Sequence, residues 1–184
     1  MIRGSIVALV TPFDEVGAID YSAIRRLVDY HVENGTRGIV AVGTTGESPT
    51  LSHDEHKKLV EVCVEQANGR VPVIAGAGSN STSEAVDFVK HACAAGADGL
   101  LVVTPYYNKP TQSGLLAHYN ELIKNSSKPI IIYDIPGRSV IQMSDNTMAE
   151  LAKNDLIVGV KDATADLARP TRLQNLIGDD FIQL

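Results

Sequence analysis

Short runs of β-branched and aliphatic residues alternate along this 184-residue chain with segments whose apolar positions recur every three to four residues. Runs that are apolar on both faces, such as Ile130-Ile131-Ile132, are typical of buried parallel strands. The pattern predicts seven strands: Ser5–Val10, Gly38–Val42, Val71–Ala75, Gly99–Val103, Ile130–Tyr133, Leu156–Val160 and Phe181–Leu184.

Helical periodicity fills the segments between these strands. Ser52 is a favourable N-cap with Glu55 at the capping-box position, and Gly96 is a typical helix stop. The predicted helices are Tyr21–Glu33, His53–Gln66, Thr82–Ala95, Ser113–Lys124, Ser144–Lys153 and Ala165–Leu176. Alternating strands and helices predict an α/β fold with a parallel sheet, either an open doubly wound sheet or a (β/α)8 barrel.

Polar residues favour the barrel, because they follow strand after strand instead of gathering at one point. A barrel site is assembled from the carboxyl ends of many strands, whereas an open sheet binds its ligand at one switch point. The polar segments are Gly43–Ser48, Gly76–Ser81, Thr104–Asn108, Tyr133–Arg138 and Lys161-Asp162.

The number of strands falls short of a complete barrel. The sequence contains about six βα units and part of a seventh strand, whereas a (β/α)8 barrel has eight. We therefore expect residues 1–184 to be the N-terminal part of a single TIM-barrel domain. Unpaired sheet edges are expected to make the isolated chain poorly soluble or partly molten, and its activity doubtful.

Composition narrows the function classes. The chain is 44% hydrophobic and 21% charged, as globular proteins are, and its net charge of −6 argues against nucleic-acid and anionic-membrane partners. The run Ser5–Val10 is too short for a signal-peptide core, and no apolar run could span a bilayer. Cys63 and Cys93 lack metal or redox spacing, which indicates reduced thiols in a cytoplasmic protein.

Lys161 and Tyr133 are the first candidates for chemistry, since each ends a predicted strand. Apolar surroundings favour a neutral lysine amine, which can attack a ketone to form a Schiff base. A phenol at the same mouth can relay protons. The alternatives are a lysine that reaches solvent or pairs with Asp162, and a core tyrosine with a satisfied hydroxyl.

Other strand-end loops contain groups that suit an anionic substrate. Thr44 and Thr45 lie between glycines whose backbone N–H groups can hold a carboxylate, or else form a tight turn. Arg138 can clamp a carboxylate or lie in solvent. Tyr106-Tyr107 suits an interface or a substrate lid, or anchors its loop.

Histidine spacing provides no convincing metal site. His53 and His56 have i,i+3 spacing, but the strand ends offer no obvious third ligand.

Four segments together resemble the dihydrodipicolinate synthase family of class I pyruvate-dependent aldolases. They are GTTGES at Gly43–Ser48, TPYYNKP at Thr104–Pro110, YDIPGRS at Tyr133–Ser139 and GVKDAT at Gly159–Thr164. The resemblance covers the whole chain. It implies a TIM barrel followed by a C-terminal helical region, so that region and the last barrel units would be absent here.

The resemblance implies a lyase that condenses pyruvate with L-aspartate 4-semialdehyde, the entry step of diaminopimelate and lysine synthesis. By this likeness Lys161 forms the Schiff base, Tyr133 relays protons, and Thr44 links Tyr133 to Tyr107. Thr45 would hold the pyruvate carboxylate, and Arg138 would receive the semialdehyde carboxylate and hold Tyr133. No metal or organic cofactor would be needed.

The family likeness also implies regulation and assembly. Feedback-inhibited members bind L-lysine with residues that correspond here to Ser48, His53, His56, Asn80, Glu84 and Tyr106. The complete enzyme would be a homotetramer, a dimer of dimers, with Tyr107 reaching the neighbouring subunit. We therefore expect inhibition by lysine.

Two residues depart from the family pattern. Asp134 stands where Asn is usual, and its carboxylate is expected to pair with Arg138 and weaken the substrate clamp. Ala165 stands where Gly is common, so that turn is expected to differ.

Two other functions stay open. A sibling class I aldolase, such as N-acetylneuraminate lyase or a 2-keto-3-deoxy sugar-acid aldolase, shares the lysine and tyrosine. An inactive fragment that acts as an interaction protein is the non-enzymatic alternative.

Overall fold

The structure is a computed structural model that describes residues 3–184; Met1 and Ile2 lie outside the described residues. The chain divides into two compact units. The first comprises the described residues up to Gly76 together with His91–Leu100, and the second comprises Ala77–Lys90 and Leu101–Leu184. Helix α3 (Thr82–Ala94) and strand β4 (Gly99–Val103) each contribute residues to both units.

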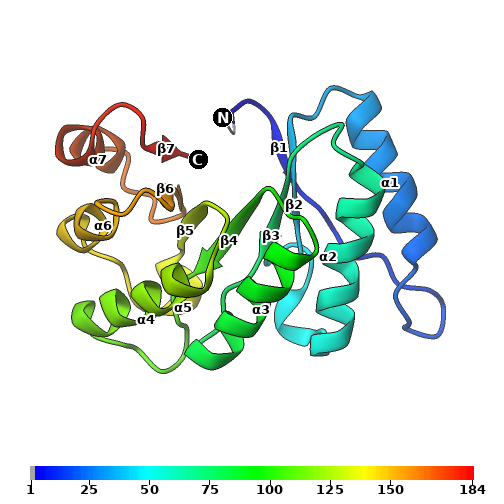
Figure 1. Cartoon of the computed structure of the whole chain (residues 1–184), viewed down its shortest axis with the longest axis horizontal. Helices are drawn as coiled ribbons and strands as arrows, with labels where there is room; N and C mark the ends of the chain where they lie inside the picture. Colours follow the sequence, from blue (N-terminus) through cyan, green and yellow to red (C-terminus); the bar gives the residue numbers. More distant parts are fainter. Residues whose placement is uncertain (1–2) are drawn as a thin grey trace. The chain divides into compact units, whose positions relative to one another are not determined.

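In the first unit, three parallel strands pair in chain order, and two helices cover one side of them (Figure 1). The buried face of each helix is apolar and includes Ile24 and Val28 of the first helix and Leu59 of the second. The elements are β1 (Ile6–Ala8), α1 (Tyr21–Glu33), β2 (Gly38–Ala41), the 3-10 turn η1 (Ser48–Thr50), α2 (His53–Ala67) and β3 (Val73–Gly76).

The second unit repeats this plan with more helices. Strands β5, β6 and β7 are parallel, and α4, α6 and α7 lie on one side of them (Figure 1). The bounds are α4 (Gln112–Asn125), β5 (Ile130–Asp134), α5 (Pro136–Ser139), α6 (Asp145–Leu151), β6 (Ile157–Asp162), α7 (Arg169–Ile177) and β7 (Ile182–Gln183).

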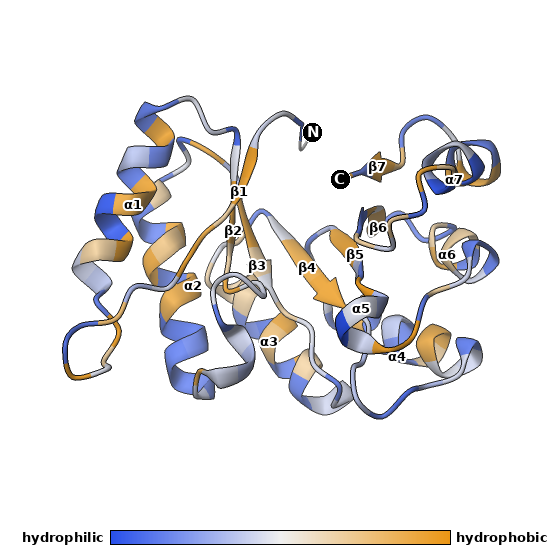
Figure 2. Ribbon diagram, turned by 180° about the vertical axis from the view of Figure 1, so that it is seen from behind, coloured by the Kyte–Doolittle hydropathy of each residue, from blue (hydrophilic) through white to orange (hydrophobic). Residues whose placement is uncertain are grey.

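Strand order follows chain order from β1 to β7. A doubly wound sheet would reverse its order at a switch point, whereas a barrel adds each strand beside the previous one. Strands β2, β3 and β5 are buried along their whole length, and hydrophobic residues predominate in the strands in Figure 2. The observed order therefore agrees with the barrel prediction.

Local sequence signals predicted most elements well. Helix α1 has the predicted bounds, and the capping box of α2 is confirmed: the Ser52 hydroxyl accepts a hydrogen bond from the Glu55 amide, and the Glu55 carboxylate accepts one from the Ser52 amide. The predicted helix Ala165–Leu176 is wrong at its start, because α7 begins at Arg169. Ala165 has a φ of +63°, which is incompatible with a right-handed helix. Two short elements, η1 and α5, were not predicted.

None of the helices within residues 3–184 combines the length and the apolar character that a membrane crossing requires.

Candidate active site

Lys161 and Tyr133 lie side by side at the ends of two paired strands. Tyr133 of β5 pairs in register with Lys161 of β6, and the lysine Nζ lies 4.3 Å from the centre of the tyrosine ring. Tyr133 is only 6% exposed, whereas Lys161 is half-buried. A cation over a partly desolvated aromatic face is attracted by the ring quadrupole. Strand ends therefore bring together an amine and a phenol, which can act as nucleophile and proton carrier.

The next pair of residues faces the other side of the sheet. Side chains alternate along a strand, so Asp134 and Asp162, which also pair in register, point away from Tyr133 and Lys161. Both carboxylates meet one guanidinium: Nη1 of Arg169 lies 2.8 Å from Oδ2 of Asp134 and 3.3 Å from Oδ2 of Asp162. A buried ion pair thus lies directly behind the candidate reactive pair.

Burial and charge act in opposite directions at this ion pair. Burial raises the pKa of Asp134, and the hydrogen bond and charge of Arg169 oppose that rise. Burial also disfavours the charged guanidinium, but the hydrogen bond and charge of Asp134, together with Asp162, outweigh it, so the pKa of Arg169 is raised. Arg169 therefore offsets part of the effect of burial on Asp134, and Asp134 in turn favours the charged guanidinium.

Asp134 does not pair with Arg138, which corrects the expectation from sequence. Its Oδ2 accepts hydrogen bonds from Arg169 and from the Met143 amide, and its side chain is fully buried. Arg138 lies in the short helix α5, exposed to solvent. The Asp134 carboxylate is therefore paired with Arg169 inside the unit, and the exposed guanidinium of Arg138 remains accessible to a ligand.

The loop after β2 forms the corresponding strand end of the first unit. Val42 and Glu47 adopt left-handed backbone conformations with φ of 55° and 60°, and the Glu47 amide donates to the Thr44 carbonyl over 3.1 Å. The Thr11 hydroxyl donates to the Gly46 carbonyl over 2.7 Å. Thr44 is half-buried and Thr45 is exposed on this tight loop.

Gly76 lies beside this loop, at a point where two backbone segments come very close together. A Cβ on Gly76, the last residue of β3, would overlap the carbonyl group of Val42. Only glycine permits this approach.

The tyrosine pair lies on a loop of the second unit. Tyr107 is 87% exposed and has a φ of 73°, whereas Tyr106 is half-buried. The next side chain, Asn108, donates to the Asn80 carbonyl over 3.0 Å. The structure therefore brings the Asn80 loop and the tyrosine loop together. Such an exposed aromatic in a strained conformation is suited to an interface.

The remaining residues of the predicted lysine site divide between the two units. Ser48 begins η1, His53 begins α2 at an exposed position, and His56 is buried one turn later. In the second unit, Glu84 of α3 accepts a hydrogen bond from the Ser79 hydroxyl. Among residues 3–184, no group of three His, Cys, Asp or Glu side chains is arranged to hold a metal ion.

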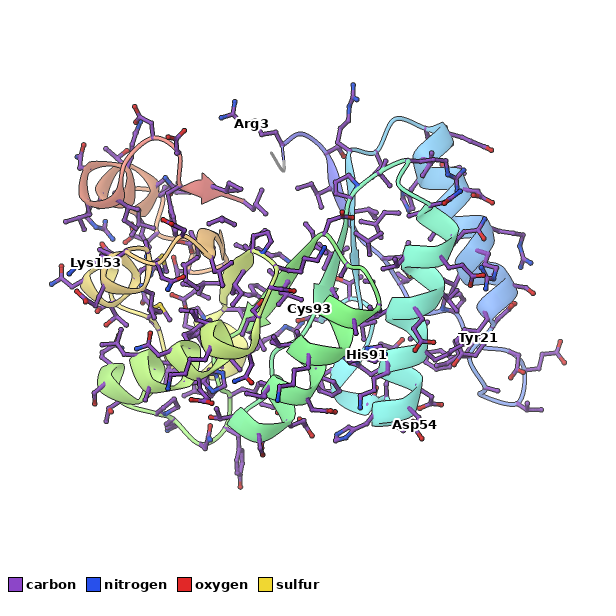
Figure 3. All side chains as sticks on the ribbon, in the orientation of Figure 1. Arg3, Tyr21, Asp54, His91, Cys93 and Lys153 are labelled. Atoms are coloured by element: carbon purple, nitrogen blue, oxygen red, sulfur yellow. The ribbon has the colours of Figure 1, made fainter. Side chains whose placement is uncertain are left out.

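One histidine and one cysteine lie in helices, away from the strand ends. His91 of α3, labelled in Figure 3, lies with its Nε2 3.1 Å from the Glu61 carboxylate of α2. Burial raises the pKa of the Cys63 thiol to about 12, which makes it a poor nucleophile.

Arg169 is the residue that reasoning from sequence missed. It lies within the predicted helix Ala165–Leu176 and was given no role there, yet its side chain is fully buried. A signal was present, because Asp134 directly follows four residues of a buried strand, and a buried carboxylate requires a cationic partner.

Comparisons with known proteins show which family the chain resembles. The sequence profile of the dihydrodipicolinate synthetase family matches residues 1–184. A 4-hydroxy-tetrahydrodipicolinate synthase of Jannaschia sp. is 59% identical over 184 residues, which are 100% of this chain and 63% of that protein. The chain thus spans less than two thirds of the length of this relative.

Two solved structures also resemble the chain. A chloride-inhibited dihydrodipicolinate synthase from Acinetobacter baumannii in complex with pyruvate has a TM-score of 0.96 and 46% identity, over 100% of this chain and 63% of its own. The enzyme of Cyanidioschyzon merolae with lysine bound has a TM-score of 0.96 and 40% identity, over 99% and 62%. With the strand order, these confirm an α/β fold with seven parallel strands, an incomplete TIM barrel.

Proposed function

Since the chain belongs to the dihydrodipicolinate synthetase family, we propose that it carries the Schiff-base chemistry of a lyase that condenses pyruvate with L-aspartate 4-semialdehyde. The observation that carries this proposal is the contact of Lys161 Nζ with the Tyr133 ring at two paired strand ends. We further propose that residues 1–184 are the N-terminal part of a single barrel domain.

The proposed chemistry starts at Lys161. Its neutral amine attacks the pyruvate ketone, water leaves, and the resulting iminium withdraws electrons from the neighbouring methyl group. Loss of a methyl proton gives an enamine, which attacks the aldehyde carbon of the semialdehyde. Tyr133 would carry protons in these steps, and the contact of its ring with the lysine amine supports this role. The lysine itself is the electron sink, so the proposal includes no cofactor.

We assign the remaining candidate residues to substrate binding and to contact between subunits. Thr45 on the loop after β2 would bind the pyruvate carboxylate, and Thr44 would connect Tyr133 with Tyr107. Arg138 is exposed and would bind the semialdehyde carboxylate through a bidentate pair. The exposed Tyr107 supports our proposal of a homo-oligomer, a dimer of dimers in which this side chain reaches a neighbouring subunit.

We also propose that L-lysine inhibits the complete enzyme by binding at Ser48, His53, His56, Asn80, Glu84 and Tyr106. Support comes from the lysine-bound relative described above and from the hydrogen bond that joins the Asn80 loop to the tyrosine loop. Full activity in millimolar lysine would refute this proposal.

Borohydride trapping tests the central proposal. The chain is incubated with pyruvate and sodium borohydride, and its intact mass is measured. Wild type and Lys153→Ala should each gain one reduced pyruvate adduct, and Lys161→Ala should gain none. Lys153 is a matched control because it is an exposed lysine paired with Glu150 on α6. An adduct that survives Lys161→Ala, or a folded wild-type chain without one, would contradict the proposal.

A further inference from the structure

Arg169 joins three acidic side chains at the start of α7. Besides Asp134 and Asp162, its Nε donates to Oδ1 of Asp145 over 2.9 Å, and its Nη2 donates to the Met143 carbonyl over 2.5 Å. Its side chain is completely buried, as is that of Asp134. The guanidinium therefore links the carboxyl ends of β5 and β6 to the beginning of α6.

The strand pairing at this point contains an irregularity. Ile130 pairs with Ile157, but Ile131 pairs with Gly159, so Val158 is an extra residue in β6. Only this insertion brings Tyr133 opposite Lys161. Without it, counting from Ile130 and Ile157 would place Asp134 opposite Lys161.

A slip of one residue reverses the faces of a strand. It would turn Lys161 away from the face that contains Tyr133, because successive side chains point to opposite sides. The relative register of β5 and β6 thus decides whether the amine and phenol meet. A bulge by itself allows this register but does not enforce it.

The bridge of Arg169 enforces the bulged register. One nitrogen, Nη1, bonds both Asp134 and Asp162, the residues directly after Tyr133 and Lys161. These two carboxylates can share that nitrogen only while they lie opposite each other. A buried ion pair adds little net stability, and its best-attested use is to specify register.

We propose that Arg169 is a positioning residue, which holds the bulged register of β5 and β6 and thereby places Lys161 Nζ over the Tyr133 ring. Asp134 and Asp162 are its two anchors. The part of this inference that concerns the reaction rests on the proposed function; the part that concerns the geometry of Lys161 and Tyr133 does not.

Ring-current shifts in NMR spectra test the geometry without any substrate. In wild type, the ε-methylene signals of Lys161 should lie upfield because the terminal amine sits over the Tyr133 ring, and Tyr133→Leu should abolish that shift and so assign it. Arg169→Met should abolish the shift as well, and Arg169→Lys should restore only part of it, because an ammonium lacks the planar fork that bonds several carboxylates. Arg172→Met should leave it unchanged.

Arg172 is a matched control for Arg169. It is on the same helix and bonds the same Asp145 over 2.7 Å, but its other partner is Asp166 and its side chain is 45% exposed. The substitution Arg172→Met therefore removes the same charge from α7 as Arg169→Met, but it leaves the bridge between Asp134 and Asp162 intact.

The rate of borohydride trapping tests the effect on chemistry. At saturating pyruvate, Arg169→Met should trap at least about tenfold more slowly per folded chain, since displacement of a reacting group by an ångström has effects of this size. A purely structural role would lower only the amount of adduct, in proportion to the folded fraction, and leave the rate and pH profile per folded chain unaltered.

The outcomes separate the two proposals. An unchanged Lys161 ring shift in folded Arg169→Met, or in folded Arg169→Lys if the methionine variant does not fold, would overturn the positioning role. Loss of the ring shift with no adduct in wild type would support the positioning role and contradict the proposed function.

Discussion

Two strand ends of this molecule are held in different ways. The loop after β2, in the first unit, is fixed by backbone contacts and neutral hydrogen bonds: Gly76 against the Val42 carbonyl, and the Thr11 hydroxyl on Gly46. The ends of β5 and β6, in the second unit, are fixed by the buried charges around Arg169. A steric contact does not depend on pH, whereas the strength of a buried ion pair changes when one of its groups gains or loses a proton. The comparison teaches that one fold can position its loops by shape or by charge.

The largest effect is expected where shape is decisive. Gly76→Ala should lower the free energy of unfolding by about 3 kcal/mol, because its Cβ would overlap the Val42 carbonyl and force β2 and β3 apart. Urea unfolding measures this change. Gly43→Ala is the control, since its Cβ would meet only Val40 Cγ1 at 3.4 Å, an ordinary contact. Equal stability of the two variants would contradict our account of this loop.

Acid should act on the second unit through a buried histidine. Burial lowers the pKa of His118 to about 4, and its Nδ1 lies 2.9 Å from the Thr82 hydroxyl. The folded chain keeps this ring neutral while the unfolded chain protonates it below its usual pKa of 6.5. His118 should therefore cost on the order of 3 kcal/mol of stability as pH falls from about 6.5 to 4, and no more below that.

His118→Gln should remove this pH-dependent loss, because an amide does not titrate. The measurement is the difference between the unfolding free energies of wild type and variant at several pH values. Protonation of Asp134, whose pKa is raised by burial, acts in the opposite direction in both proteins and cancels in the difference. An identical slope in the two proteins would refute the assignment.

A smaller effect is expected from a single neutral hydrogen bond. Thr11→Val removes the donor to the Gly46 carbonyl and leaves that buried acceptor unpaired, which should cost about 1–2 kcal/mol in thermal or urea unfolding. Thr50→Val provides the comparison, because the Thr50 hydroxyl donates to the Glu47 carbonyl at an exposed site where water can replace it. If both variants lost the same stability, burial would not be the cause.

The smallest change should be a gain. Ala165 has a φ of +63°, which glycine adopts freely, so Ala165→Gly should stabilise the second unit by about 0.5–1 kcal/mol. Ala163→Gly, two residues earlier and without a positive φ, should instead lose stability through chain entropy. A loss in both variants would show that the Ala165 turn is not strained.

Sequence alone predicted those features that depend on neighbouring residues. The capping box of α2 and the bounds of α1 follow from local spacing. The meeting of Tyr133 and Lys161 followed from their places at the ends of successive strands. The late start of α7 was missed because two turns precede it. The Thr164 amide donates to the Asp162 side chain, and the Asp166 amide donates to the Thr164 hydroxyl. The periodicity of apolar residues does not reveal such turns.

The ion pair of Arg169 was missed for a different reason. Its partner Asp134 lies 35 residues earlier in the chain, and an arginine near a helix start resembles a solvent-exposed residue until the fold buries it. The expected pair of Asp134 with Arg138 relied on proximity in sequence, but alternation along β5 and the turn into α5 separate the two. Roles of individual residues in binding and catalysis stay predictions.

The sequential order of the strands has a consequence for synthesis on the ribosome. Each strand pairs with the one made just before it, so every pairing requires closure of only one strand–helix segment. Each such pairing needs only residues that have already been translated. The first unit's three strands can therefore assemble while the lysine-bearing strand is still being made.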